Sequence, residues 1–319
     1  MLGGFVEISY LCKKMRYMEV ANPIYDVVFK FLMEDDRVAR TILSALLKKE
    51  VTSVEVRPHE YSNTMKEPVS MFRIDFAATI RQPDGSEQLT LIELQKSWVP
   101  SEVLRFRQYL GVQYESERNM TAEGYGLPMV AVYLLGHKVG DIEEPVLYVH
   151  HEPLDYDGRL VTKGMPDPFV SSLTHDSIIV QIPRLHGKIN NRLDQVLSVF
   201  DQSQANGDNQ HTLFLDESRY AEDDAEMQRI LRRLLMAAAS SEMRQDMNVE
   251  DEYYSYLEMK ETEVLMKDKV IAEKDAQLSK QQDQLRKSIK MLLNAGQSLR
   301  DIAENLGLDE ETVSKLSKS

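Results

Sequence analysis

The stretch from Glu250 to Lys290 constrains the fold most, because it contains neither proline nor glycine. Apolar residues recur in it at every seventh position, and the column continues just beyond it: Leu257, Val264, Ile271, Leu278, Leu285 and Leu292. A seven-residue repeat is typical of a helix that buries one stripe against a partner helix. The stretch therefore predicts a long charged helix over residues 251–290.

The heptad column offers only a thin interface for such a partner. The positions three residues further on are polar, namely Lys260, Lys267, Lys274 and Gln281, whereas a coiled coil needs a second apolar column. Two interpretations stay open. The helix is either solvated along its length, or it forms a weak homodimer in which the lysines meet acids of the second chain.

Composition excludes several classes of protein. The chain has 319 residues, 42% of them hydrophobic and 28% charged, which is typical of a globular protein. A net charge of −14 argues against broad, non-specific nucleic-acid binding but allows a local basic groove. The single cysteine, Cys12, excludes an internal disulfide scaffold, and there is no secretory signal pattern. The longest apolar run, 127–135, is about half of a membrane span. We therefore expect a cytoplasmic protein that does not enter a membrane.

Helical and strand patterns alternate over the first 200 residues. We expect a helix after Asn22-Pro23, with Asn22 as its cap. Further helices are expected over 37–49, 101–117, 190–200 and 224–240, and strands over 51–57, 72–80, 89–95, 128–135, 145–150 and 177–182. The first seventeen residues fit no pattern and predict a disordered N-terminus.

Two acidic residues face each other across a predicted hairpin. The turn signal is Gln82-Pro-Asp-Gly-Ser86, and a turn centred between Asp84 and Gly85 pairs Asp75 with residue 94. A shift of one residue would place Asp75 beside Glu93. Two adjacent carboxylates repel each other unless a divalent cation lies between them, and oxygen ligands suit Mg²⁺ or Mn²⁺. The alternative is a pair of acids on a solvated face of the sheet.

Five segments, in this order, resemble the PD-(D/E)XK nuclease superfamily and, more narrowly, its recombination-promoting nuclease and putative transposase family. The segments are Asn22-Pro-Ile-Tyr-Asp-Val-Val-Phe-Lys30, Ile74-Asp-Phe76, Ile92-Glu-Leu-Gln-Lys96, Arg105-Phe-Arg-Gln-Tyr109 and Ile178-Ile-Val-Gln-Ile-Pro-Arg-Leu185. The similarity covers residues 22 to about 202. It implies an α/β fold in which a mixed sheet is flanked by helices and followed by a long helical C-terminal tail.

The resemblance also implies a catalytic site. Asp75 and Glu93 would hold Mg²⁺ (or Mn²⁺), and Asp26 would complete the metal site. Asp26 could instead be an acid that stabilises the positive end of a helix. Gln95 stands where the superfamily usually has a catalytic lysine, so it could orient a water molecule but supplies no charge. Lys96 is adjacent, and strand alternation directs it to the other face unless a bulge intervenes.

Arg105 and Tyr109 are four residues apart and therefore share one face of a helix. They could contact DNA phosphate and sugar, or Tyr109 could pack in the core while Arg105 is a surface charge. Five histidines show no spacing typical of metal ligands: His150, His151, His175, His186 and His211.

The last segment, residues 291–319, has a helix-turn-helix pattern with Gly307 at the turn. Its second helix opens with Asp309-Glu310-Glu311, and these acids would repel phosphates. The segment either reads DNA or is a small packing or partner element. Together the patterns predict a disordered segment 1–20, a nuclease-like core 21–202, a helical extension 203–250, the long helix 251–290 and the element 291–319.

These features favour a Mg-dependent endodeoxyribonuclease with DNA as its partner, linked to recombination or mobile elements. The alternative function is a catalytically weak or inactive nuclease-fold protein that binds DNA or protein through its helical tail.

Overall fold

The computed structural model describes residues 17–57, 73–97, 103–187, 189–207 and 209–318. Within helices and strands it describes the backbone alone for residues 57, 73–75, 93–97, 103–105, 109, 257, 258, 261 and 318. The chain divides into two compact units, residues 1–251 and 252–319.

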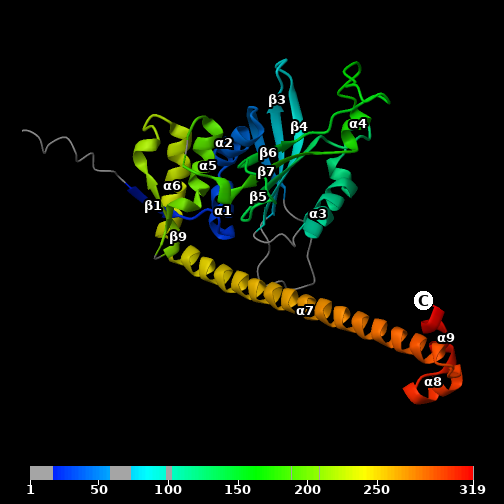
Figure 1. The fold of residues 1–319 in the computed structure, drawn as a ribbon. Helices are drawn as coiled ribbons and strands as arrows, with labels where there is room; N and C mark the ends of the chain where they lie inside the picture. Colours follow the sequence, from blue (N-terminus) through cyan, green and yellow to red (C-terminus); the bar gives the residue numbers. More distant parts are fainter. Residues whose placement is uncertain (1–16, 58–72, 98–102, 188, 208, 319) are drawn as a thin grey trace, which may run out of the picture. The chain divides into compact units, whose positions relative to one another are not determined.

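A six-stranded mixed sheet forms the centre of the first unit (Figure 1). Its strands are β2 (Val51–Arg57), β3 (Arg73–Arg81), β4 (Glu87–Ser97), β5 (Met129–Leu135), β6 (Val146–Val149) and β7 (Asp176–Gln181). Their order is β2-β3-β4-β5-β7-β6. Strands β2, β3 and β4 form an antiparallel meander, whereas β4, β5 and β7 are parallel and β6 is antiparallel to β7. The expected α/β class and mixed sheet flanked by helices are therefore confirmed.

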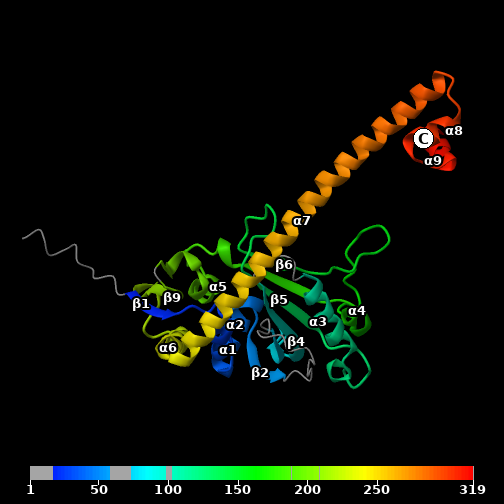
Figure 2. The same ribbon diagram turned by 90° about the horizontal axis from the view of Figure 1, so that it is seen from below.

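Helices cover both faces of this sheet (Figures 1 and 2). One face carries α1 (Asp26–Met33) and α2 (Asp36–Leu47), and α5 (Arg192–Leu197) and α6 (Ala225–Ala239) pack against these two helices. The other face carries α3 (Val103–Glu115), whose Leu110 packs against Leu91, Met129 and Ala131 of the sheet. Short 3₁₀ turns lie at Glu117–Asn119, Ile182–Arg184, Ser198–Phe200, Gln202–Gln204 and Glu217–Arg219.

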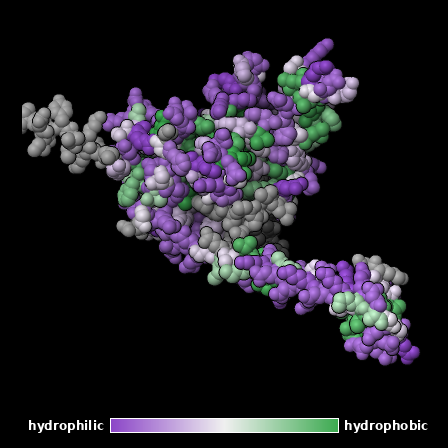
Figure 3. Space-filling model, viewed as in Figure 1, coloured by the Kyte–Doolittle hydropathy of each residue, from purple (hydrophilic) through white to green (hydrophobic). Residues whose placement is uncertain are grey.

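The main core lies between the sheet and the first group of helices. Its largest fully buried side chains include Phe29, Leu32, Phe76 and Ile92, and each such side chain contributes about 1.5–3 kcal/mol. Apolar residues also gather at the surface over α4 (Pro168–Ser172), where Phe169 is exposed, while the rest of the visible face is mostly hydrophilic (Figure 3).

A second, three-stranded sheet joins the two ends of the first unit. Strand β1 (Tyr17–Ala21) pairs antiparallel with β9 (Asn209–Asp216), which also pairs with β8 (Ala205–Asn206). The expectation of disorder up to residue 20 is therefore wrong for residues 17–20, while residues 1–16 lie outside the described residues. Strand β9 was not expected from the sequence, because its partner strand is about 190 residues away.

The helical extension is part of the core unit and not a separate segment. Helix α6 packs against α1 and β1, and the first unit extends to Asp251. The boundary expected at residue 202 is thus wrong. Helix α7 (Ser241–Asn294) begins inside this unit, ten residues before the expected start, and its Met247 is fully buried there.

The second unit contains the end of α7 together with α8 (Leu299–Leu306) and α9 (Glu310–Lys318). Ile289, Ile302 and Val313 are fully buried, one from each helix. Gly307 ends α8 with a φ of 64°, a left-handed conformation that glycine adopts without strain. The two helices and the turn expected here are confirmed. In the part of the chain that the structure describes, no helix is both long and apolar enough to cross a membrane.

The start of α7 should be required for the stability of the first unit. A chain that ends after Ser255 keeps Met247 and Glu250, so it should unfold in one cooperative transition. A chain that ends after Ser240 loses the buried Met247 side chain and the Glu250 cap of α1. Its free energy of unfolding should be lower by at least about 3 kcal/mol. Urea unfolding of both chains measures this difference, and equal midpoints would contradict it.

Candidate functional site

The β3–β4 hairpin pairs Asp75 directly with Glu93. The expected partner of Asp75 was residue 94, and the structure shows that no bulge is needed. The loop covers residues 82–86 between the pair Arg81 and Glu87, so the turn is centred on Asp84. Gly85 has a φ of 84° in this loop, which glycine adopts readily. The backbone thus brings the two sequence-predicted acids into one register position.

The pair Asp75 and Glu93 belongs to a row of directly paired residues that extends across the neighbouring strands. Arg57 pairs with Asp75 on one side, and Ala131 pairs with Glu93 on the other. Beyond Ala131 the row continues through Ser177 of β7 to Val149 of β6. Direct partners in a sheet lie on the same face. The acid pair is therefore next to an arginine position on one side and to small residues on the other.

A second row, two residues along, contains Gln95. Its partners are Arg73 in β3 and Tyr133 in β5. Neither Arg57 nor Arg73 belongs to the site residues expected from the sequence. The pairing register of β2, β3 and β4 is the signal that could have identified these two arginines. It places Arg57 in the row of Asp75 and Arg73 in the row of Gln95.

Both rows belong to the face of the sheet that α3 covers. Alternate residues of a strand share a face, so positions 75 and 93 go with Ala77 and Leu91, and Leu91 packs against Leu110 of α3. Lys96 pairs with Leu134, whose side chain belongs to the main core on the opposite face. No register shift is found in this stretch, so the bulge that would move Lys96 is absent from the described pairing. The side chains of Asp75, Glu93, Gln95 and Lys96 lie outside the described residues.

Helix α3 presents Arg105 and Tyr109 next to its sheet-facing stripe. Phe106 and Leu110 are buried, and the Phe106 ring lies 5.1 Å from the Tyr133 ring. Positions 105 and 109 each precede one of these residues and so form the adjacent stripe of the helix. Their side chains lie outside the described residues. The helix thus lies on the same face of the sheet as the acid pair.

The N-terminus of α1 carries Asp26 and is capped from a distant part of the chain. The residue that precedes the helix, Tyr25, makes no side-chain cap. Instead, the buried Glu250 carboxylate accepts hydrogen bonds from the backbone N–H groups of Asp26 and Val27, at 2.8 and 2.9 Å. Asp26 itself is 8% exposed. Glu250 therefore holds the backbone that positions Asp26.

Asn22 is not the helix cap that we expected. It is fully buried and exchanges two amide hydrogen bonds with Gln202, and its amide also donates to the Gln210 carbonyl at 2.9 Å. The Asn22 side chain thus connects the segment before α1 to the 3₁₀ turn Gln202–Gln204 and to strand β9.

Tyr25, His211 and Asp251 form a network beside this cap. The Tyr25 hydroxyl donates to Asp251 Oδ1 at 2.8 Å, and His211 Nε2 lies 2.7 Å from Asp251 Oδ2. The rings of Tyr25 and His211 meet edge to face, with centroids 5.0 Å apart. Burial raises the pKa of the Tyr25 hydroxyl strongly, and the hydrogen bond to Asp251 raises it further. The network therefore keeps Tyr25 neutral.

Three of the histidines that the sequence spacing left without a role lie close together. His150 Nδ1 is 2.9 Å from Asp176 Oδ2, His151 Nδ1 is 4.0 Å from Asp176 Oδ1, and the rings of His151 and His175 are 6.3 Å apart. Among the side chains that the structure describes, however, no group of three or more His, Cys, Asp or Glu could hold a metal ion. The expected ligands Asp75 and Glu93 are not in that set.

Comparisons of the chain with known protein families, with curated proteins and with solved structures found no match.

The Tyr25 network should make stability depend on pH. The pKa of Tyr25 is raised in the folded state, so its stabilisation is fully present below about pH 10 and is lost as pH rises further. Tyr25→Phe should cost about 1 kcal/mol at pH 8, because the hydrogen bond to Asp251 is lost. It should also make the decline in the free energy of unfolding above pH 10 less steep.

Urea unfolding between pH 8 and 11 measures both effects. Tyr156→Phe is the matched control, because Tyr156 is 98% exposed, and it should change neither. Identical behaviour of the two variants would contradict the role of the network.

Proposed function

We propose that the chain is a metal-dependent endonuclease that hydrolyses phosphodiester bonds in DNA, linked to recombination or mobile elements. The observation that carries this proposal is the direct pairing of Asp75 with Glu93 in the hairpin. A cytoplasmic location, where DNA is accessible, agrees with the single cysteine.

The donor set at this position fits a hard divalent cation. Two carboxylate residues at one register position repel each other in the absence of a cation, and oxygen ligands suit Mg²⁺ or Mn²⁺. The ion would be held by Asp75 and Glu93, and it would supply an activated water and stabilise the charge that develops on the phosphate. The place of Asp26 as a third ligand rests on the resemblance to the PD-(D/E)XK nucleases alone.

Neighbouring residues of the same face suit phosphate. Arg57 and Arg73 are register partners of Asp75 and Gln95, and arginine binds phosphate through paired N–H donors. They would supply the positive charge that Gln95 lacks, while the Gln95 amide would orient the attacking water. Arg105 and Tyr109 on α3 would contact the DNA backbone, and Lys96 would at most contact it from the opposite face of the sheet.

A second function is a nuclease-fold binding module that acts through its tail. This candidate is favoured by the packed core of the second unit, where α8 and α9 share Ile302 and Val313 with the end of α7. The opening acids of α9, Glu310 and Glu311, argue against phosphate contacts there. This unit therefore suits a protein partner better than DNA.

We also propose that α7 pairs weakly with a second copy of the chain. Val264, Ile271 and Leu278 of the heptad column are each more than half exposed, and pairing would bury them. Lys260 and Lys267 already bond to Glu263 on their own helix. These two lysines thus have partners within the chain, and the exposed apolar column would provide most of the attraction.

Removing either acid should eliminate metal-dependent cleavage. Asp75→Ala or Glu93→Ala should lower the rate of plasmid nicking in Mg²⁺ or Mn²⁺ by at least about a thousandfold, because the ion contributes several kcal/mol to the transition state. Both variants should keep the wild-type melting temperature or exceed it, since the repulsion between the acids is removed.

Glu87→Ala is the matched control, because Glu87 is an exposed acid of the same strand that pairs with Arg81. It should nick at the wild-type rate. Normal nicking by the purified Asp75→Ala or Glu93→Ala variant would refute the assignment.

Gln95 should affect the rate of cleavage but not the binding of DNA. Gln95→Ala removes the group that orients water, so single-turnover cleavage should slow by about tenfold, the value of one hydrogen bond. The affinity for a DNA duplex in Ca²⁺ should stay the same, and Gln95→Lys should restore or raise the rate. An unchanged rate for Gln95→Ala would show that Gln95 has no part in the reaction.

A further inference from the structure

A basic pocket lies between α2, the start of β2, α5 and α6, in the first unit. Its volume is about 980 Å³. Six cationic side chains line it and only two acidic ones, Glu50 and Glu226; the cations are Arg37, Arg40, Lys48, Arg192, Arg229 and Arg232. In a chain with a net charge of −14, such an excess of cations is a local feature and not a reflection of overall composition.

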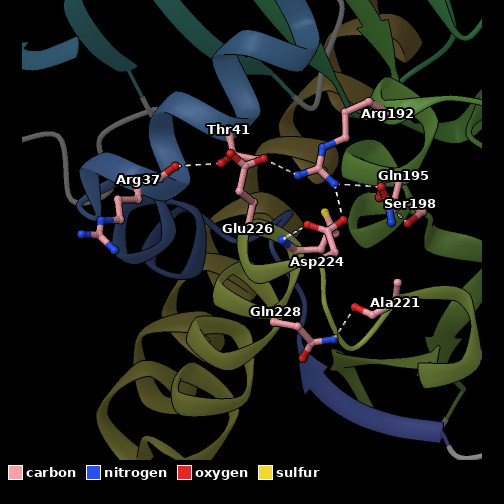
Figure 4. Close-up of polar contacts among 10 residues, drawn as sticks. Arg37, Thr41, Arg192, Gln195, Ser198, Ala221, Asp224, Glu226 and Gln228 are labelled. Atoms are coloured by element: carbon pink, nitrogen blue, oxygen red, sulfur yellow. Dashed lines mark hydrogen bonds and ion pairs between the residues drawn. The ribbon is translucent and has the colours of Figure 1, made fainter. Parts of the chain in front are cut away.

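Two of these cations, Arg192 and Arg229, form ion pairs with acidic side chains, and these ion pairs fix their positions in the pocket lining. Figure 4 shows the Arg192 guanidinium between the carboxylates of Asp224 and Glu226. The two N···O distances are both 2.5 Å. Burial opposes the charge of Arg192, but the bonds to the two acids outweigh it and raise the pKa of Arg192. The two carboxylates therefore more than neutralise the single charge of Arg192.

Arg229 is balanced in the same way by Asp35, the N-cap of α2, at 2.7 Å. The hydrogen bond from Arg229 is the main reason that the pKa of Asp35 is lowered. Because Asp35 caps α2 and Arg229 belongs to α6, this ion pair also fixes the two helices that form the pocket.

The other four cations have no acidic side chain within ion-pair distance among the described residues. Arg40 is held by its bond to the Thr52 carbonyl at 3.0 Å, and Lys48 Nζ lies 4.1 Å from the centre of the Tyr148 ring. Arg37 and Arg232 are exposed and come from two different helices. Of the two lining acids, Glu50 is bound to Arg81 at 2.7 Å. The pocket therefore has unbalanced positive charge.

We propose that this pocket binds a small anion that carries two or more phosphate groups. Arginines without acidic partners from two different helices, Arg37 of α2 and Arg232 of α6, suit such a ligand, because their forked N–H donors bind phosphate oxygens in pairs. The volume lies at the upper end of the range for small-molecule sites. None of the described residues that line the pocket is aromatic, so the phosphate groups, and not a stacked base, provide the recognition.

The pocket is separate from the proposed catalytic position. Val51 lines it, whereas the β2 residue that pairs with Asp75 is Arg57. Six residues of extended strand span roughly 20 Å. The pocket also lies on the α2 face of the sheet, opposite the α3 face. The inference therefore does not depend on the nuclease proposal.

Titration calorimetry of the full chain with inorganic tripolyphosphate tests the inference. Arg37→Gln combined with Arg232→Gln should weaken binding by at least about tenfold, because each substitution removes one unbalanced charge. The matched control combines Lys138→Gln with Lys163→Gln, which removes the same charge from exposed positions outside the pocket. It should leave the affinity within about twofold. Tripolyphosphate should also raise the melting temperature of the wild type and of the control.

The affinities of ATP, orthophosphate and a DNA oligonucleotide, compared with that of tripolyphosphate, identify the class of anion that the pocket binds. ATP should bind within about threefold of tripolyphosphate, and orthophosphate should bind far more weakly. Absence of tripolyphosphate binding would overturn the proposal, and so would equal weakening by the control pair. Tighter binding of a DNA oligonucleotide than of tripolyphosphate, lost in Arg37→Gln/Arg232→Gln, would show that the pocket is a nucleic-acid contact instead.

Discussion

The first unit depends on a carboxylate that lies more than 220 residues from the groups it binds. The first turn of any helix leaves N–H groups without partners, and the residues before α1 do not satisfy them. Glu250 accepts from two of them and places a negative charge at the positive end of the helix dipole. The same contact fixes the start of α7, so that Met247 packs in the core and Asp251 meets Tyr25 and His211.

Most elements of the central sheet could be predicted from the sequence, because each depends on local signals. The turn at 82–86 and the apolar alternation around Asp75 and Glu93 predicted the hairpin to within one residue of register. The long-range partners could not be predicted. Neither Glu250 as a helix cap nor β9 as the partner of β1 has a local signature, since both act on segments about 190 or more residues away. For the same reason the boundary of the core was expected at 202 and lies at 251.

At the candidate site, the pairing register of the strands places positively charged residues where the sequence motif has none. Gln95 has no charge, yet the meander places Arg73 directly beside it and Arg57 beside Asp75. A motif records spacing along one strand, whereas an active site is assembled across strands. In the proposed site, the positive charge that a lysine would supply on the same strand would come from an arginine on the neighbouring strand, whose planar guanidinium binds phosphate through paired N–H donors.

The pairing of β1 with β9 has a consequence for how the protein is made on the ribosome. At a synthesis rate of 5–20 residues per second, the roughly 190 residues between these strands take about 10–40 s to emerge. During this time Val20 and Ala21, both fully buried in the finished protein, have no partner strand, and α1 has no cap until Glu250 emerges. The edge of β1 and the first turn of α1 therefore keep backbone groups without their native partners until the distant segments have been synthesised.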